Sequence, residues 1–466
     1  MRHAKVRWRD VTKSGRFNLL WTPLVILSAG TIAYAAVSRG WNVGFAIAVV
    51  VLAFALYRRP VDTHIFTTDV REVVGSPAAR GVLVAALPSI LQSVLVNTSF
   101  SLVALLSVLL MVCVLADSHG RNRSQRPPST HLLGWAIVFG LGTSVWPLLV
   151  SGASAQLSFY IPAALYFVAK RVPVRRSDLR PVIIALWLAS SAYAGVHVFW
   201  RVILNQGTDG LQQIYSHEYA LWPVLGCVAA LALRRLGLLL ISGGLLAAIF
   251  WDYPAASYVV ALAVALAVFI AAAHRLWGIS LVSLVLAFAI AVPFLLVAGI
   301  LDPSEAQEYF AAAGKGDNTD TRLMLWRQAL ETWEQNVLLG TLNQEQVGVR
   351  LQSAGSIIIV PPHNDFLAVA SGAGLVGLLP LIAGLWLTLR SLLAAVGSGI
   401  LAKEQMLVLR IIVAASCVTI ALATFNPILA NPAASAPFWY LLGLGLAATA
   451  PLDAHRATTQ PSRAGG

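Results

Sequence analysis

Apolar segments of about 15 to 23 residues follow one another along most of this 466-residue chain, and no other feature restricts the fold as strongly. A helix needs roughly 20 apolar residues to cross a hydrocarbon core about 30 Å thick. The chain is 58% hydrophobic and only 11% charged, whereas roughly a quarter of the residues in a soluble domain are charged. The sequence therefore predicts an all-α, polytopic membrane protein, because a barrel would show alternating segments of about ten residues.

We predict about 12 to 14 transmembrane helices in a single integral membrane domain over residues 1–466. Cys113, Cys227 and Cys417 each lie inside an apolar segment, so we expect neither a disulfide framework nor a metal site. The predicted spans are 18–37, 43–57, 81–96, 99–116, 132–150, 155–169, 182–204, 219–233, 236–251, 258–273, 278–300, 367–389, 407–424 and 437–449.

The formal net charge of +12 could by itself indicate binding to nucleic acid. However, when alternate loops are assigned to one side of the membrane, most of the 32 Lys and Arg residues fall on that side. By the positive-inside rule this side is the cytoplasm, which also places both termini in the cytoplasm. The basic excess is thus a topology signal, and we expect no nucleic-acid partner.

One long polar interval, residues 301–366, separates two late spans and is predicted to be a large loop on the outer side of the membrane. Within it, an amphipathic helix is indicated by apolar residues that recur on one side, with Asp320 as the N-cap. We expect this helix to lie flat over the bundle, since tryptophan suits the membrane interface. The stripe consists of Leu323, Trp326, Leu330, Trp333 and Val337.

The polar interval ends at Pro361-Pro362-His363-Asn364-Asp365. Two prolines favour an extended chain, and Asn364 can then cap the following membrane helix, which places His363 at the mouth of that helix. A helix N-terminus suits a phosphate, and histidine can transfer a proton near neutral pH. From these residues alone, a purely structural histidine remains the alternative.

Four short patterns in this region resemble the O-antigen ligase and polymerase superfamily, whose members are polytopic inner-membrane proteins with a large late periplasmic loop. The patterns are Arg322-x3-Trp326, Leu338-Leu339-Gly340, His363-Asn364-x2-Leu367, and Ser371-Gly372-Ala373-Gly374-Leu375-Val376-Gly377-Leu378. The resemblance covers about residues 320 to 380 closely, and the topology elsewhere is compatible with it.

This resemblance implies glycan transfer from undecaprenyl diphosphate to an acceptor hydroxyl, with neither metal nor cofactor. It implies His363 as the catalytic base and Arg322 as a catalytic, diphosphate-binding residue. The family often has a Ser-Arg-Gly stretch before the loop, but this chain has Ala256-Ser257-Tyr258-Val259 there. The arginines that could replace the missing one are Arg201, Arg39 and Arg327.

Asn364, Asp365 and Glu218 are further candidates for contacts to the acceptor or support of the site. For the two carboxylates we expect solvated surface positions, since Asp and Glu are mostly exposed.

The favoured hypothesis is an O-antigen ligase whose acceptor is the lipid A core oligosaccharide, in the bacterial inner membrane with its active site facing the periplasm. A polymerase of the same superfamily would use another lipid-linked repeat unit as acceptor, and the motifs do not separate the two. A lipid or sugar permease with an outer lid is the alternative from a different class. Ionisable residues are nearly absent from the predicted spans, which argues against an ion pathway.

Overall fold

A computed structural model describes residues 63–94, 128–151, 157–198, 220–252, 256–298, 300, 319–342, 349–353, 356–360 and 362–449. The chain divides into two compact units, Met1–Asp69 and Val70–Gly466. Only the start of helix α3 (Thr63–Gly75) is described in the first unit, and every other described helix lies in the second. The prediction of a single domain over residues 1–466 stays a prediction.

Every regular element in the described residues is a helix except for one short hairpin, in agreement with the predicted all-α fold. The hairpin pairs β1 (Val349–Ser353) with β2 (Ser356–Val360) in antiparallel fashion within the polar interval, and it was not predicted. The helices after α3 are α4 (Pro77–Val94), α6 (Pro128–Ser151), α7 (Leu157–Ala169), α8 (Arg176–Val198), α9 (Leu221–Leu233), α10 (Leu236–Asp252), α11 (Ala256–Ala271), α12 (Arg275–Val297), α14 (Thr319–Gln335), α15 (Asp365–Val396), α16 (Lys403–Ala423) and α17 (Pro432–Ala447).

Four of the described helices, α8, α12, α15 and α16, are long and apolar enough to cross a membrane. A bent pair, Asp69–Gly75 with Pro77–Ile90, would make a fifth span if the two helices count as one, and several shorter apolar helices accompany them. The chain is therefore a multi-pass membrane protein. The spans expected at 18–37, 43–57 and 99–116 lie outside the described residues, so the total of 12 to 14 stays a prediction.

Each described membrane helix overlaps a predicted span, but α8 begins at Arg176 instead of residue 182. The reason is local hydrogen bonding at its start. The Asp178 carboxylate accepts a hydrogen bond from the Arg175 backbone N–H at 2.7 Å. This hydrogen bond gives the Arg175 N–H, at the start of α8, a partner. The polar turn that precedes the apolar residues can therefore be helical as well.

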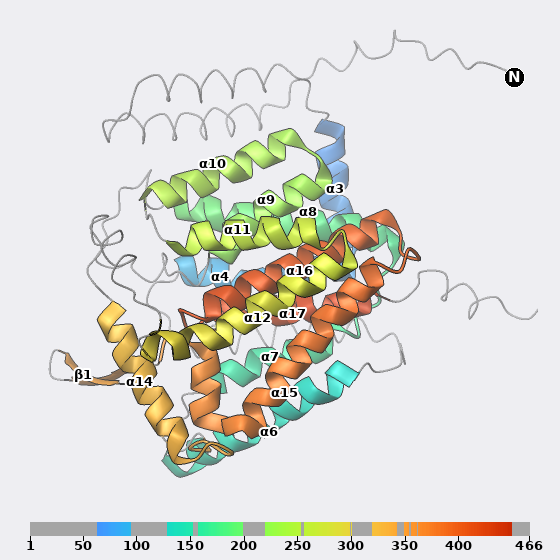
Figure 1. Cartoon of the computed structure of the whole chain (residues 1–466). Helices are drawn as coiled ribbons and strands as arrows, with labels where there is room; N and C mark the ends of the chain where they lie inside the picture. The colour runs from blue at the N-terminus through green and yellow to red at the C-terminus, as the bar shows by residue number, and fades with distance from the viewer. Residues whose placement is uncertain are drawn as a thin grey trace, which may run out of the picture. The chain divides into compact units, whose positions relative to one another are not determined.

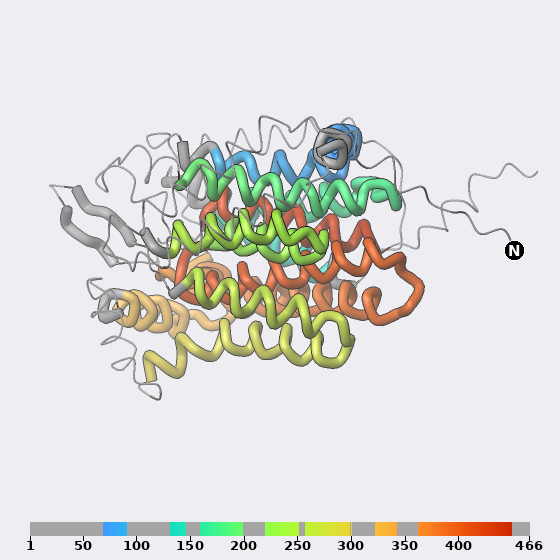
Figure 2. The backbone as a smooth tube through the Cα atoms, turned by 90° about the horizontal axis from the view of Figure 1, so that it is seen from above, coloured from blue at the N-terminus to red at the C-terminus, as the bar shows by residue number. Residues whose placement is uncertain are grey.

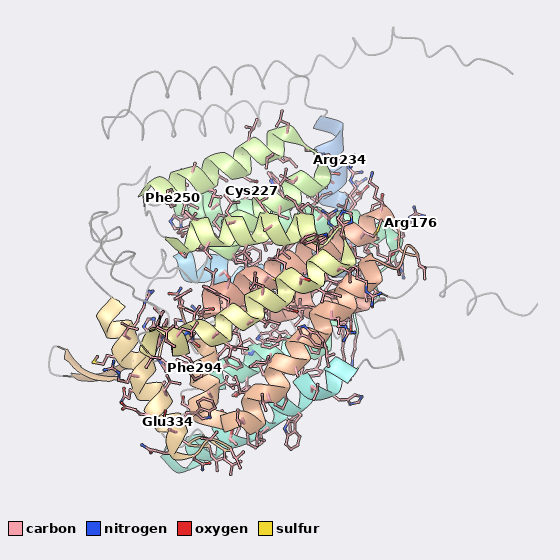
Figure 3. The ribbon with its side chains drawn as sticks, viewed as in Figure 1. Arg176, Cys227, Arg234, Phe250, Phe294 and Glu334 are labelled. Atoms are coloured by element: carbon pink, nitrogen blue, oxygen red, sulfur yellow. The ribbon has the colours of Figure 1, made fainter. Side chains whose placement is uncertain are left out.

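Helices α8 to α12 run side by side in two views at right angles (Figures 1 and 2). Helix α16 contacts α8, α9, α11, α12, α15 and α17, so it lies among the others. Figure 3 shows Arg176 and Arg234 toward one end of this bundle and Phe294 and Glu334 toward the other. This separation agrees with the predicted alternation of loops, while the side that faces the periplasm stays a prediction.

Helix α15 is interrupted at Gly374, whose φ of 60° and ψ of −163° are not helical. A side chain is disfavoured at this positive φ, and a Cβ here would also collide with the backbone of Leu338. The interruption separates a short first part, residues 365–373, from the longer part, residues 375–396. It therefore divides the segment that begins beside His363 from the segment that continues into the bundle.

The turn that follows α14, residues 336–342, docks into this interruption through backbone hydrogen bonds. The N–H groups of Leu375 and Val376 donate to the carbonyls of Val337 and Leu338 at 3.0 and 3.1 Å. In return, the Thr341 N–H donates to the Ser371 carbonyl at 2.8 Å. We call this contact the α14–α15 joint. It satisfies backbone groups that a broken membrane helix would otherwise leave without partners.

Replacing Gly374 with alanine should open the α14–α15 joint. The strained backbone conformation alone costs about 1–3 kcal/mol, and the new methyl group also displaces the Leu338 carbonyl. We expect the purified Gly374→Ala protein to unfold at a lower temperature than the wild type. Gly243→Ala in α10 is the matched control, because a Cβ there meets nothing within 4 Å. Equal unfolding temperatures for the two variants would contradict this role of Gly374.

Candidate active site

His363 lies just before α15 in a left-handed backbone conformation, with φ of 51°. Non-glycine residues rarely adopt this conformation, although histidine is among those that tolerate it better. Its side chain is partly buried, and its Nδ1 atom is buried without a hydrogen-bond partner among the described residues. The imidazole is thus held at the start of a membrane helix with one ring nitrogen unused.

Asn364, the next residue, connects the start of α15 to the end of α16. Its Oδ1 accepts a hydrogen bond from the Leu367 N–H at 2.9 Å and so caps α15, as predicted. Its Nδ2 donates to the Thr424 carbonyl at the end of α16, at 2.7 Å. Because the side chain is only 1% exposed, water competes little for these bonds.

Asp365 holds the connection between α16 and α17. Its Oδ2 accepts a hydrogen bond from the Leu429 N–H at 2.6 Å, and its Oδ1 accepts one from the Ala430 N–H at 3.1 Å. The expectation of a solvated carboxylate is wrong for Asp365, which is 1% exposed. The physical reason is that backbone donors replace water around both oxygens. Asn364 and Asp365 together form a clamp that holds residues 424–430 against the start of α15.

Arg322 lies in the first turn of α14 and is partly buried. Burial of the imidazole, together with the positive charge of Arg322, lowers the pKa of His363 from 6.5 to about 4. The two residues that the resemblance selects as catalytic are thus close enough to interact electrostatically. At neutral pH the imidazole is uncharged and can accept a proton.

Helix α14 reaches this position because one side of it is buried against the bundle. Leu325, Trp326, Ala329 and Leu330 form a cluster with Leu367 of α15, and Leu323 and Trp333 pack against the cluster. The predicted apolar stripe is confirmed except at Val337, which follows the end of the helix and is 41% exposed. Helix α14 also begins at Thr319, which places Asp320 inside its first turn instead of at the cap.

A narrow apolar crevice lies between α12 and α15, next to the clamp. Asn364 is the polar residue in its lining, and the remainder is apolar. Its volume of about 10 Å³ is roughly that of one water molecule. A lipid chain could therefore enter only if α12 and α15 moved apart. The lining residues are Ala289, Ile290, Pro293, Phe294, Asn364, Phe366, Leu367, Ala370 and Leu378.

Residues 219–382 match the family model described as O-antigen ligase, Wzy_C. This stretch is similar to the O-antigen ligase family. It contains α9 to α14 and the first part of α15, and therefore both Arg322 and His363, and it confirms the resemblance to the O-antigen ligase and polymerase superfamily. The family implies a glycosyltransferase-like enzyme of lipopolysaccharide biosynthesis. No curated protein matches the chain.

Of the remaining arginine and glutamate candidates, the structure describes Arg327. Arg327 is exposed on α14, about 140° around the helix from Arg322. Arg201, Arg39 and Glu218 lie outside the described residues. Within the described residues, no group of three or more His, Cys, Asp or Glu side chains could hold a metal ion.

Sequence reasoning missed the contacts that residues 424–430 make beside His363. Their contacts with Asn364 and Asp365 are made by backbone carbonyl and N–H groups. Such groups are common to nearly every residue, so the sequence carries little signal for these contacts. The signal that the sequence does carry is the polar pair Asn364-Asp365 at the start of an apolar segment.

Asp365→Asn should loosen the clamp, because an amide offers one acceptor oxygen to two backbone donors. A buried donor without a partner costs about 1–3 kcal/mol. We expect faster hydrogen exchange at the Leu429 and Ala430 amides, measured by mass spectrometry of the peptides that cover them. Glu334→Gln, at an exposed position near the end of α14, is the control and should leave this exchange unchanged. Wild-type protection in Asp365→Asn would show that the clamp does not depend on the carboxylate.

Arg322→Gln should raise the pKa of His363 above 4, because a positive neighbour that disfavours the imidazolium is removed. The pKa should stay below 6.5, since burial is the larger cause of the shift and remains. An NMR titration of histidine-labelled protein, assigned with His363→Gln, measures this change. Arg327→Gln removes an exposed charge from the same helix and should have a much smaller effect. The prediction fails if Arg322→Gln leaves the titration of His363 unchanged.

Proposed function

We propose that this protein is an O-antigen ligase that transfers a glycan from undecaprenyl diphosphate to a sugar hydroxyl of the lipid A core oligosaccharide. The reaction takes place at the periplasmic face of the bacterial inner membrane, without metal or cofactor. The observation that carries the proposal is the position of Arg322 beside His363 within an O-antigen ligase domain. The predicted topology supports the periplasmic orientation, because it places this end of the bundle opposite the basic loops.

In the proposed reaction, the acceptor hydroxyl attacks the anomeric carbon of the first sugar of the donor. A new carbon–oxygen bond forms while the bond from that carbon to the diphosphate breaks. His363 accepts the hydroxyl proton as general base, and undecaprenyl diphosphate leaves with the bonding electron pair. This single displacement inverts the configuration at the anomeric carbon. Diphosphate is a good leaving group, so a general acid is not required.

Arg322 binds the diphosphate in this proposal, since a guanidinium group matches the geometry of phosphate oxygens. Its second effect is on His363. Before the donor binds, the charge of Arg322 disfavours the imidazolium. Once diphosphate neutralises that charge, the pKa of His363 rises and the imidazole becomes a stronger base. Donor binding and activation of the acceptor are thereby linked.

The donor lipid also needs an apolar path to the site. The crevice between α12 and α15 is lined by apolar side chains and includes Asn364, which directly follows His363. In the proposed complex, the isoprenoid units nearest the diphosphate part these two helices. Burial of the chain then contributes about 25 cal/mol per Å² of apolar surface removed from water.

A polymerase of the same superfamily is the second candidate, and the matching family domain favours it equally. In that case the acceptor is another lipid-linked repeat unit. The chemistry proposed for His363 and Arg322 is identical for both enzymes. The two functions differ in the product that accumulates when the enzyme is lost.

His363→Gln and Arg322→Gln should each abolish detectable transfer in a cell that lacks the native gene. Loss of a general base typically costs 10²–10⁴-fold in rate, and loss of one electrostatic contact costs about 10²–10³-fold. Mass analysis should then show lipid A core without attached polymer, together with long lipid-linked glycan. Accumulation of single lipid-linked repeat units would instead indicate the polymerase.

Glu334→Gln serves as the control for expression and folding, since Glu334 is exposed at the far end of α14 from Arg322. It should restore wild-type lipopolysaccharide. If both His363→Gln and Arg322→Gln also restored it, neither residue would have the proposed role.

A further inference from the structure

Trp326 lies one helical turn after Arg322 on α14, and its side chain is only 2% exposed. Residues four apart on a helix are neighbours on the same side. The indole Nε1 atom of Trp326 is buried and has no hydrogen-bond partner among the described residues. A buried donor beside a cation of the proposed site is thus left without an acceptor.

Other tryptophans show that this chain can supply acceptors to indole groups. Trp333, two turns further along α14, donates to the Val337 carbonyl at 2.9 Å. Trp187 and Trp386 donate to serine hydroxyls at 3.0 and 3.1 Å. Trp222 and Trp439 also have buried indole nitrogens without partners among the described residues, but they lie within the apolar helices α9 and α17. Trp326 differs because it lies on α14, which is not among the helices long and apolar enough to cross a membrane, and one helical turn from Arg322.

Packing fixes the orientation of the Trp326 ring. Its centroid is 6.0 Å from that of Phe425, and the ring belongs to the apolar cluster that seats α14. Phe425 directly follows Thr424, whose carbonyl is bound by Asn364, the neighbour of His363. The indole therefore lies between the helix that carries Arg322 and the segment held by the clamp. An indole N–H group held this rigidly loses little conformational entropy when it forms a hydrogen bond to a ligand.

We propose that the Trp326 indole N–H donates a hydrogen bond to a phosphate oxygen of the diphosphate-linked donor, next to the guanidinium group of Arg322. This inference rests on the proposed function and assigns a further substrate-binding residue to it. Negative charge grows on the diphosphate as the anomeric bond breaks, so a fixed donor in a dry site stabilises the transition state more than the ground state. An uncharged donor has a second advantage over another cation, because it does not disfavour protonation of His363.

The test compares Trp326→Phe with Trp333→Phe in purified full-length protein reconstituted into liposomes. Both changes remove an indole N–H and keep an aromatic ring, but the Trp333 group already has an acceptor in the protein. Transfer is measured with undecaprenyl-diphosphate-linked glycan and lipid A core, and geranyl diphosphate serves as a competing ligand. We expect Trp326→Phe to lower kcat by about 10- to 100-fold and to weaken inhibition by geranyl diphosphate. Trp333→Phe should change both values by less than about threefold.

A sulfur isostere separates the loss of the donor from a packing effect. Site-specific incorporation of 3-benzothienylalanine at position 326 keeps the two fused rings and replaces the N–H by sulfur. The same loss of kcat and of inhibition is expected at an unchanged unfolding temperature. Wild-type kcat and inhibition in this protein would overturn the inference.

A different experimental result would contradict the proposed function. If wild-type protein binds geranyl diphosphate but transfers no glycan to lipid A core, the ligase assignment is wrong. The contact from Trp326 is then still decided by whether the sulfur isostere weakens binding of geranyl diphosphate.

Discussion

The α14–α15 joint is the interaction on which the arrangement of the site depends. Helix α14 carries Arg322, and α15 begins beside His363, yet the two helices are separated in the chain by the hairpin and its flanking residues. Backbone hydrogen bonds between residues 336–342 and the interruption at Gly374 connect the two helices. Glycine at 340 and 374, both with positive φ, permits the close approach of the backbones. The apolar cluster around Trp326 then holds the middle of α14 against the bundle.

The clamp supplies the second constraint, on the histidine itself. A left-handed conformation at His363 is costly unless the surrounding structure enforces it. Asn364 and Asp365 provide that enforcement, because their buried side chains bind the end of α16 and the connection to α17. The position of the imidazole thus depends on three membrane helices and not on the loop alone. Burial and the charge of Arg322 then keep this imidazole neutral.

The sequence predicted the parts of the molecule whose physical cause is local. The lengths of the apolar segments predicted the membrane helices, and the periodic apolar residues between 323 and 333 predicted α14. Asn364 was correctly expected to cap α15. The resemblance selected Arg322 and His363, and in the structure the charge of Arg322 acts on the imidazole of His363. What could not be predicted depends on contacts between distant backbone groups, such as those of Asp365 with residues 429 and 430, and on the reciprocal docking of the two glycine motifs. The motif Leu338-Leu339-Gly340 has no apparent role until its partner at Gly374 is seen.

The clamp also bears on where the diphosphate can bind. The start of α15 was expected to offer a phosphate free N–H groups and partial positive charge. In the structure, Asn364 already accepts the Leu367 N–H, and the Asp365 carboxylate lies in the first turn of the helix. Both features make that helix end less suited to an anion, because one donor is occupied and a negative charge is close. The groups that donate hydrogen bonds to the diphosphate should therefore come from α14. The sequence lacks the arginine of the family's Ser-Arg-Gly stretch. In our proposal the uncharged indole N–H of Trp326 supplies a further hydrogen bond to the diphosphate. It adds no positive charge that would oppose the imidazolium of His363.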